Sequence, residues 1–186
     1  LASLYGDLMM KCLYRTRPYE KLEGSAEALM DSWFNRIVHN IKNLNRNEFK
    51  RNVNKIVQEF DELPIHEDGV KPKVGIAGEI LVKYHPNANN NLVEIIEQEG
   101  GEAVVPAFID FFEYGMWNKV FNYEHLNGSK KEKTLNQLYI KVIEHYRELV
   151  RAACADSKRF EPDEYIQHTA SNAEQFISVG NQCGEG

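Results

Sequence analysis

The fold of this chain is decided by residues 73–106, which read KVGIAGEILVKYHPNANNNLVEIIEQEGGEAVVP. The short apolar run at 73–78, bounded by glycine, predicts a buried strand, and residues 103–105 before a proline predict a second. Apolar residues between positions 92 and 96 predict a helix, which a pair of glycines at 100–101 ends. Strand, helix and strand over about thirty residues have the size of one βαβ unit, for which parallel pairing and a right-handed crossover are the default. We therefore predict two parallel strands, with a ligand-facing turn at the carboxyl edge of the first.

Most of the remaining sequence has helical periodicity, with apolar residues three and four positions apart. The clearest helical pattern runs from Leu135 to Val150, and the aromatic segment from Phe108 to Trp117 is predicted to be core. The predicted helices cover residues 1–14, 25–44, 46–63, 108–126, 135–150 and 162–179.

Two of these helix boundaries carry additional signals. Asn45 with Glu48 three positions later predicts a capping box. Pro162 is predicted at the first position of the last helix, where Asp163 and Glu164 would complement the helix dipole.

These patterns predict a helix-rich α/β fold, in which a Rossmann-like βαβ half-domain with few parallel strands carries a helical cap. We divide the chain into a helical segment, 1–70, and a Rossmann-like segment with C-terminal helices, 71–186. Two strands cannot form a sheet that buries both its faces, so we expect further strands outside this sequence. The sequence starts at Leu1 rather than Met and ends in a polar, glycine-rich segment, 180–186, so we expect a truncated piece of a longer protein.

The composition limits the compartments and partners that fit. With 22 basic and 28 acidic residues the net charge is −6, so we expect binding neither to nucleic acid nor to acidic lipid. No apolar run approaches the roughly 18–20 residues of a membrane span, and no secretory signal opens the sequence. Cys12, Cys154 and Cys183 lie far apart, which argues against a disulfide framework or a zinc site. A cytoplasmic protein with reduced thiols fits best.

The loop from Gly78 to Asn91 is the candidate binding site, because ligands of open α/β sheets lie at the carboxyl ends of the strands. Lys83 and His85 offer cationic groups for an anion, and Glu79 is a candidate acid–base or ligand-orienting group. The alternative is that the asparagines only cap a helix and that Glu79 only accepts hydrogen bonds from backbone amides. The glycine spacing does not match the dinucleotide-binding pattern. The candidate ligand-binding residues are Gly78, Glu79, Lys83, His85, Asn89, Asn90 and Asn91; the catalytic residues stay unknown.

Three stretches of the sequence carry a resemblance to a known family. Residues 73–106, together with Arg17–Glu20 and Gly180–Gly186, resemble the dehydratase-related region of the large activators of 2-hydroxyacyl-CoA dehydratases. These proteins are also described as activators of 2-hydroxyglutaryl-CoA dehydratase or as CoA-substrate-specific enzyme activases. The resemblance touches most of the chain and is densest from Lys73 to Asn118.

This resemblance implies a system in which an ATP-hydrolysing activase with an iron–sulfur cluster delivers an electron to a dehydratase. The dehydratase subunits of that system are Rossmann-like and hold a [4Fe–4S] cluster on cysteines. This chain has no phosphate-binding ATPase motif, so ATP and the cluster are expected only in the longer parent protein, and no metal or cofactor here. The resemblance makes Cys183 a weak candidate ligand there, whereas Cys12 and Cys154 lie on helical apolar patterns that predict burial.

The main hypothesis is therefore a non-catalytic portion of a dehydratase-activator protein, with a 2-hydroxyacyl-CoA dehydratase or an activase domain as partner. One alternative is a module that binds an anion such as a CoA phosphate at the loop. Another is a helical protein-interaction domain. If the aromatic helix at 108–117 lacks cover, its exposed apolar surface would also support a homodimer.

Overall fold

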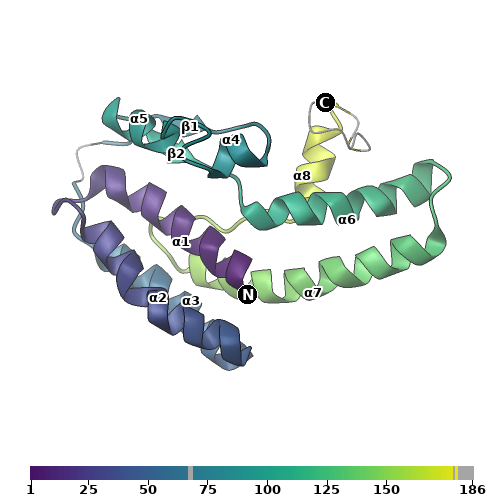
Figure 1. Cartoon of the computed structure of the whole chain (residues 1–186), viewed down its shortest axis with the longest axis horizontal. Coiled ribbons are helices and arrows are strands. Elements are labelled where there is room, and N and C mark those ends of the chain that lie inside the picture. Colours follow the sequence, from purple (N-terminus) through teal and green to yellow (C-terminus); the bar gives the residue numbers. More distant parts are fainter. Residues whose placement is uncertain (67–68, 178, 180–186) are drawn as a thin grey trace. The chain divides into compact units, whose positions relative to one another are not determined.

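The computed structural model describes residues 1–66, 69–177 and 179 of the chain. It is rich in helices and contains a small two-stranded sheet (Figure 1). None of the described helices combines the length and apolar character needed to cross a membrane. In chain order the elements are α1 (Ala2–Thr16), the 3-10 helix η1 (Arg17–Tyr19), α2 (Ser25–Asn43), α3 (Arg46–Glu62), β1 (Lys73–Gly75), α4 (Ile80–Tyr84), α5 (Leu92–Gln98), β2 (Glu102–Val104), α6 (Phe108–His125), α7 (Lys130–Ala155) and α8 (Ile166–Ala173).

The chain forms two compact units. The first contains Leu1–Pro106 and Leu149–Pro162, and the second contains Ala107–Glu148 with the described residues from Asp163 onward. Residues 70 and 71, between which we predicted a domain boundary, both belong to the first unit. Helix α7 contributes to both units, its last turns to the first and the rest to the second.

The two strands pair in parallel, which confirms the pairing predicted for residues 73–106. Val74 lies opposite Ala103 in the register. The Ile76 N–H donates to the Val104 carbonyl at 2.9 Å, and the Glu102 N–H donates to the Pro72 carbonyl at 2.9 Å. The chain is therefore a helix-rich α/β protein, as expected from the switch in hydrophobic period.

Helix α5 supplies the apolar cover of this sheet. Ile76, Ile96 and Ala103 form a buried cluster against which Leu92, Val93 and Val105 pack. The turn between helix and strand is tight, because a Cβ at Gly101 would lie 2.9 Å from Cγ2 of Ile96. Gly100, just before it, has a φ of +86°, a value that favours glycine.

The expectation that the first strand is buried is wrong for β1 itself. Lys73, Val74 and Gly75 are all exposed, and only Ile76, directly after the strand, is buried. In the described part of the chain β1 pairs with β2 alone, so it forms one edge of the sheet.

Helices α1, α2 and α3 enclose the main core of the first unit, where Trp33, Phe49 and Phe60 are almost fully buried. A hydrogen-bonded chain crosses this core, since the Tyr5 hydroxyl donates to Asn40 Oδ1 at 2.8 Å and accepts from Asn52 Nδ2 at 2.9 Å. Burial of the Tyr5 side chain raises the pKa of its hydroxyl to about 12, so the hydroxyl keeps its proton at neutral pH.

The Asn45 half of the predicted capping box is confirmed. Asn45 is the N-cap of α3, and its Oδ1 accepts a hydrogen bond from the Glu48 N–H at 3.0 Å. This bond satisfies one of the amides that the first turn of a helix leaves without an intrahelical acceptor.

In the second unit α6 and α7 run antiparallel as a hairpin (Figure 1). Two ion pairs join opposite ends of the hairpin, Arg147 with Asp110 and Lys133 with Glu124, each at 2.7 Å. Helix α8 packs against α6.

The predicted limits of the last helix are wrong at both ends. Helix α8 starts at Ile166 rather than at Pro162, and it ends at Ala173 rather than near Val179. Tyr165, the N-cap of α8, has an extended backbone, so the segment from Pro162 to Tyr165 is not helical; its hydroxyl donates to Glu148 at 2.8 Å.

Candidate functional site

The loop from Gly78 to Asn91 follows the carboxyl end of β1, where it was predicted. The chain turns at Gly78, whose φ of +140° favours glycine and whose added Cβ would lie 3.2 Å from Cγ1 of Val82. Further along, the Tyr84 hydroxyl donates to the Pro106 carbonyl at 2.9 Å. This bond ties the loop to the segment that follows β2, so the loop spans the carboxyl edge of both strands.

Glu79 and Asn89 hold this loop together through hydrogen bonds between their side chains and backbone groups. Glu79 is the N-cap of α4, and its Oε1 accepts from the Val82 N–H at 3.0 Å. Asn89 Oδ1 accepts from the Leu92 N–H at 3.2 Å, while its Nδ2 donates to the Val82 carbonyl at 2.8 Å. The capping role foreseen as the alternative for these residues is therefore what the structure shows.

Asn90 and Asn91 have a different local role. Both have a φ of +56°, in the left-handed region that asparagine tolerates better than most residues. The Asn91 N–H donates to the Pro86 carbonyl at 2.9 Å. Asn91 is also the N-cap of α5, but its side chain makes no capping bond. The two residues thus reverse the chain direction before α5.

Lys83 and His85 are the cationic candidates of the loop. The Lys83 ammonium lies 5.5 Å from the centroid of the Tyr84 ring, within the range of a cation–π contact. His85 is exposed to solvent. Lys83 lies in α4 and His85 is the C-cap of that helix, so both residues belong to the segment that follows the carboxyl end of β1.

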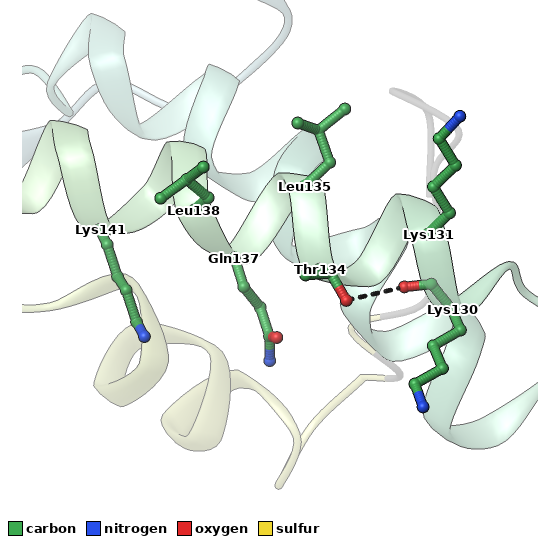
Figure 2. Close-up of a pocket in the computed structure, with 7 residues that line it drawn as sticks. All are labelled: Lys130, Lys131, Thr134, Leu135, Gln137, Leu138 and Lys141. Atoms are coloured by element: carbon green, nitrogen blue, oxygen red, sulfur yellow. Dashed lines mark hydrogen bonds between the residues drawn. The ribbon is translucent and has the colours of Figure 1, made fainter.

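A second candidate site lies along α7 and was not predicted. It is a hollow of about 760 Å³ lined by residues from the first half of that helix. Figure 2 shows Lys130, Gln137 and Lys141 extending to one side of α7, and Leu135 and Leu138 to the other. The Thr134 hydroxyl donates to the Lys130 carbonyl at 3.0 Å, so it is engaged within the helix. The lining residues are Lys130, Lys131, Thr134, Leu135, Gln137, Leu138 and Lys141.

Next to this hollow is an exposed apolar surface, which we call the outer face of α7. Its members recur at helical spacing on one side of α7. They are Leu135, Leu138, Tyr139 and Val142, with 43%, 56%, 47% and 52% of their surface exposed. Ile140 and Arg147, which lie seven residues apart on another side of the helix, are buried.

The outer face is not covered by the partner helix of the hairpin. Arg147 and Lys133 bind carboxylates of α6, so the side of α7 that carries them faces α6. At 100° per residue, Leu138 and Val142 lie roughly opposite that side. A hairpin of two helices covers only the facing sides of its members, and the outer face is left to solvent.

The aromatic helix α6 departs from its predicted place in the core. Phe111 and Phe112 were expected in the core, yet both are exposed. The buried residues of α6 are instead Glu113, Asn118 and Val120. Two polar side chains therefore occupy the interior where aromatic rings were expected.

Glu113 belongs to a buried ionic cluster around Arg147. The guanidinium Nη1 of Arg147 donates to Asp110 Oδ1 at 2.7 Å and makes a closer contact with Glu113 Oε2. Glu144 Oε1 lies 3.8 Å from the same nitrogen. The side chains of Arg147 and Glu113 are 4% and 0% exposed, so their contact is shielded from bulk water, whereas the Asp110 side chain is 39% exposed.

This arrangement disfavours the charged form of Glu113. Burial raises the pKa of Glu113 to about 7, and the negative charge of Glu144 acts in the same direction against the opposing effect of Arg147. Burial also raises the pKa of Asp110. Glu113 Oε1 has no hydrogen-bond partner among the described residues. Sequence reasoning missed this cluster, because a carboxylate within an aromatic helix gives no sign of its partner.

The described residues do not offer a site for an iron–sulfur cluster. No group of three or more histidine, cysteine or acidic residues in the described ranges is placed to hold a metal ion. Cys12 and Cys154 are buried, as predicted from their helical patterns. Cys183, the cysteine that the family resemblance singles out, lies outside the described residues.

Comparisons with known proteins add no neighbour to this picture. No protein-family model matches the chain, and neither does a curated protein or a solved structure. A functional assignment therefore has to rest on the residues and the geometry described above.

Proposed function

We propose that this chain is a non-catalytic interaction module of a protein related to the activators of 2-hydroxyacyl-CoA dehydratases. In this proposal it contacts a dehydratase or an activase domain through the second unit, and the first unit is a Rossmann-like scaffold. The [4Fe–4S] cluster and ATP belong to the parent protein or its partner. The observation that supports the proposal is the outer face of α7, four large apolar side chains about half exposed on one side of a helix.

The outer face of α7 can supply part of the free energy of a specific contact. Fully burying a large apolar side chain contributes about 1.5–3 kcal/mol. Because each residue of the outer face is already about half buried, covering it would contribute roughly 1 kcal/mol per side chain. The four together contribute on the order of 4 kcal/mol before the entropic cost of association, so neighbouring polar contacts must add to the affinity.

The carboxyl-edge loop fits this non-catalytic role. Glu79, the one acid–base candidate of the loop, already accepts a hydrogen bond from the Val82 N–H. Asn89 uses both the oxygen and the nitrogen of its side-chain amide for bonds to backbone groups. These side chains position the loop on the parallel strands, which is a structural task.

Binding to purified partners tests the proposal. The chain should bind a purified 2-hydroxyacyl-CoA dehydratase or its activase in surface plasmon resonance, and Leu138→Glu should weaken that binding at least tenfold. Leu22→Glu is the matched control, since Leu22 is an exposed leucine of the first unit. Unchanged affinity of Leu138→Glu, or no binding by the unmodified chain to either partner, would refute the proposal.

A second candidate function is the binding of an anion such as a CoA phosphate. The observation that favours it is the position of Lys83 and exposed His85 on the loop at the carboxyl edge of the sheet. A ligand that binds the native state raises its melting temperature. Acyl-CoA should therefore raise the melting temperature of the chain but not that of a Lys83→Ala, His85→Ala variant. An equal rise in both proteins would exclude this site.

A further inference from the structure

The outer face of α7 has the geometry of a helix-packing seam. Leu135, Leu138 and Val142 follow one another at spacings of three and four residues, and Lys131 continues the same line one turn earlier. This is the spacing with which a helix presents knobs to a second helix. Tyr139 widens the seam on one side.

The flank of the seam opposite Tyr139 is basic. Lys130 and Lys141 lie three helical turns apart on one flank of α7, and both line the hollow beside Leu138. In Figure 2 these two lysines extend to the same side, with Gln137 between them. No carboxylate is among the described residues that line the hollow.

A second copy of this chain is a poor occupant for the seam. If two copies of α7 pair antiparallel about a two-fold axis, the same flank of each helix meets, and an axis near the centre of the seam brings Lys130 of one copy to Lys141 of the other. If they pair in parallel, residues of the seam meet their own counterparts, and Lys131 faces Lys131. Either arrangement places like charges side by side, which is destabilising.

An anionic membrane surface is also disfavoured. The chain carries a net charge of −6, which repels acidic lipids at long range. A partner helix, by contrast, meets only the seam and its basic flank.

We propose that the outer face of α7 binds an amphipathic partner helix whose apolar stripe is flanked by acidic side chains. This inference rests on the proposed function, and it defines the chemistry of the partner. Leucine-sized side chains of the partner pack between Leu135, Leu138 and Val142. Glutamate or aspartate on its flank pairs with Lys130 and Lys141, which selects the partner and its orientation.

Two designed helical peptides test the inference directly. Both are monomeric and carry the same leucine stripe, but one has glutamate and the other lysine on its flanks. In fluorescence anisotropy at low salt, the glutamate peptide should bind the full chain at least tenfold more tightly than the lysine peptide. The preference should shrink as salt screens the exposed charges.

Charge-reversal variants sharpen the test. Lys130→Glu combined with Lys141→Glu should invert the preference between the peptides, whereas Lys42→Glu, on an exposed residue of α2, should leave it unchanged. Leu138→Glu should remove binding of the glutamate peptide, with circular dichroism verifying that the helices persist. Equal binding of both peptides, or a preference that survives the charge reversal, would overturn the inference. So would binding to phosphatidylserine vesicles that Leu138→Glu abolishes.

The outcomes also separate this inference from the proposed function. If dehydratase binding depends on Leu138 but not on Lys130 and Lys141, the proposed function holds and the acidic helix is wrong. If the glutamate peptide binds as expected while neither dehydratase nor activase binds, the inference holds and the proposed function falls.

Discussion

Replacing Glu113 by glutamine is expected to stabilise the second unit at pH 8 and to have little effect at pH 5. Glutamine has the shape of the protonated side chain and cannot ionise. The substitution therefore removes the cost of placing a negative charge in a site from which water is excluded.

The magnitude follows from the pKa of Glu113, which burial raises from 4.5 to about 7. Each tenfold change in an ionisation constant corresponds to about 1.4 kcal/mol, so ionising Glu113 costs roughly 3 kcal/mol more in the folded than in the unfolded chain. Because the pKa of the folded state is the higher one, the stability that the chain gains from a protonated Glu113 is complete below pH 4.5. It is lost as the pH rises to about 7.

At pH 8 the Glu113→Gln variant should therefore be more stable than the unmodified chain by up to about 3 kcal/mol. At pH 5 most of the contribution is still present, and the two proteins should differ by less than about 1 kcal/mol. The opposing view is that the contact between Glu113 and Arg147 stabilises the fold as an ion pair, in which case the substitution destabilises the protein at pH 8.

Urea unfolding followed by fluorine NMR of fluorotryptophan distinguishes these outcomes. The chain contains two tryptophans, Trp33 in the first unit and Trp117 in the second, so each unit has its own signal. Glu124→Gln is the control, because this exposed carboxylate pairs with Lys133 at the surface and should change stability by less than about 1 kcal/mol at any pH. A loss of Trp117 stability at pH 8 in Glu113→Gln, or a difference that does not vary with pH, would refute the reasoning.

Two local features of the fold give further predictions. Asn45→Ala should lower the free energy of unfolding by about 1 kcal/mol in urea titrations, because the α3 cap is lost, while Asn45→Asp should retain stability; equal stability of the alanine variant would contradict the capping role. Gly101→Ala should destabilise the chain by more than about 1 kcal/mol, since the new methyl group would lie 2.9 Å from Ile96. Gly115→Ala, in an open position of α6, should instead stabilise it by up to about 1 kcal/mol, and thermal melts of the two variants that shift in the same direction would argue against this explanation.

Local signals in the sequence were sufficient for the sheet and for most of the helices, although the limits of α8 and the short helix α4 within the candidate loop were missed. The glycine-bounded run at 73–78 and the paired glycines before Glu102 predicted parallel strands, because chain length between them leaves room for only one short crossover. The cap at Asn45 could also be predicted, because this interaction is local and spans only three residues. Within the candidate loop, the sequence placed the residues correctly at the carboxyl edge but left open whether Glu79 and Asn89 bind a ligand or cap the helices.

The errors concern burial and long-range pairing. The spacing of Leu135, Leu138 and Val142 identifies an apolar face, but it does not reveal whether another element covers that face. The cluster of Glu113 with Arg147 was invisible for a related reason. Its members lie 34 positions apart, and only the alignment of the hairpin brings them together.

The parallel register of β1 and β2 also determines how the backbone of the edge strand exchanges its protons. The bonds at Pro72 and Ile76 direct the N–H of every second residue toward β2, so that of Val74 points inward. Those of Lys73 and Gly75 point away from the sheet, into water. Deuterium uptake along this strand should therefore alternate residue by residue, with Val74 and Ile76 slow and the two amides flanking Val74 fast.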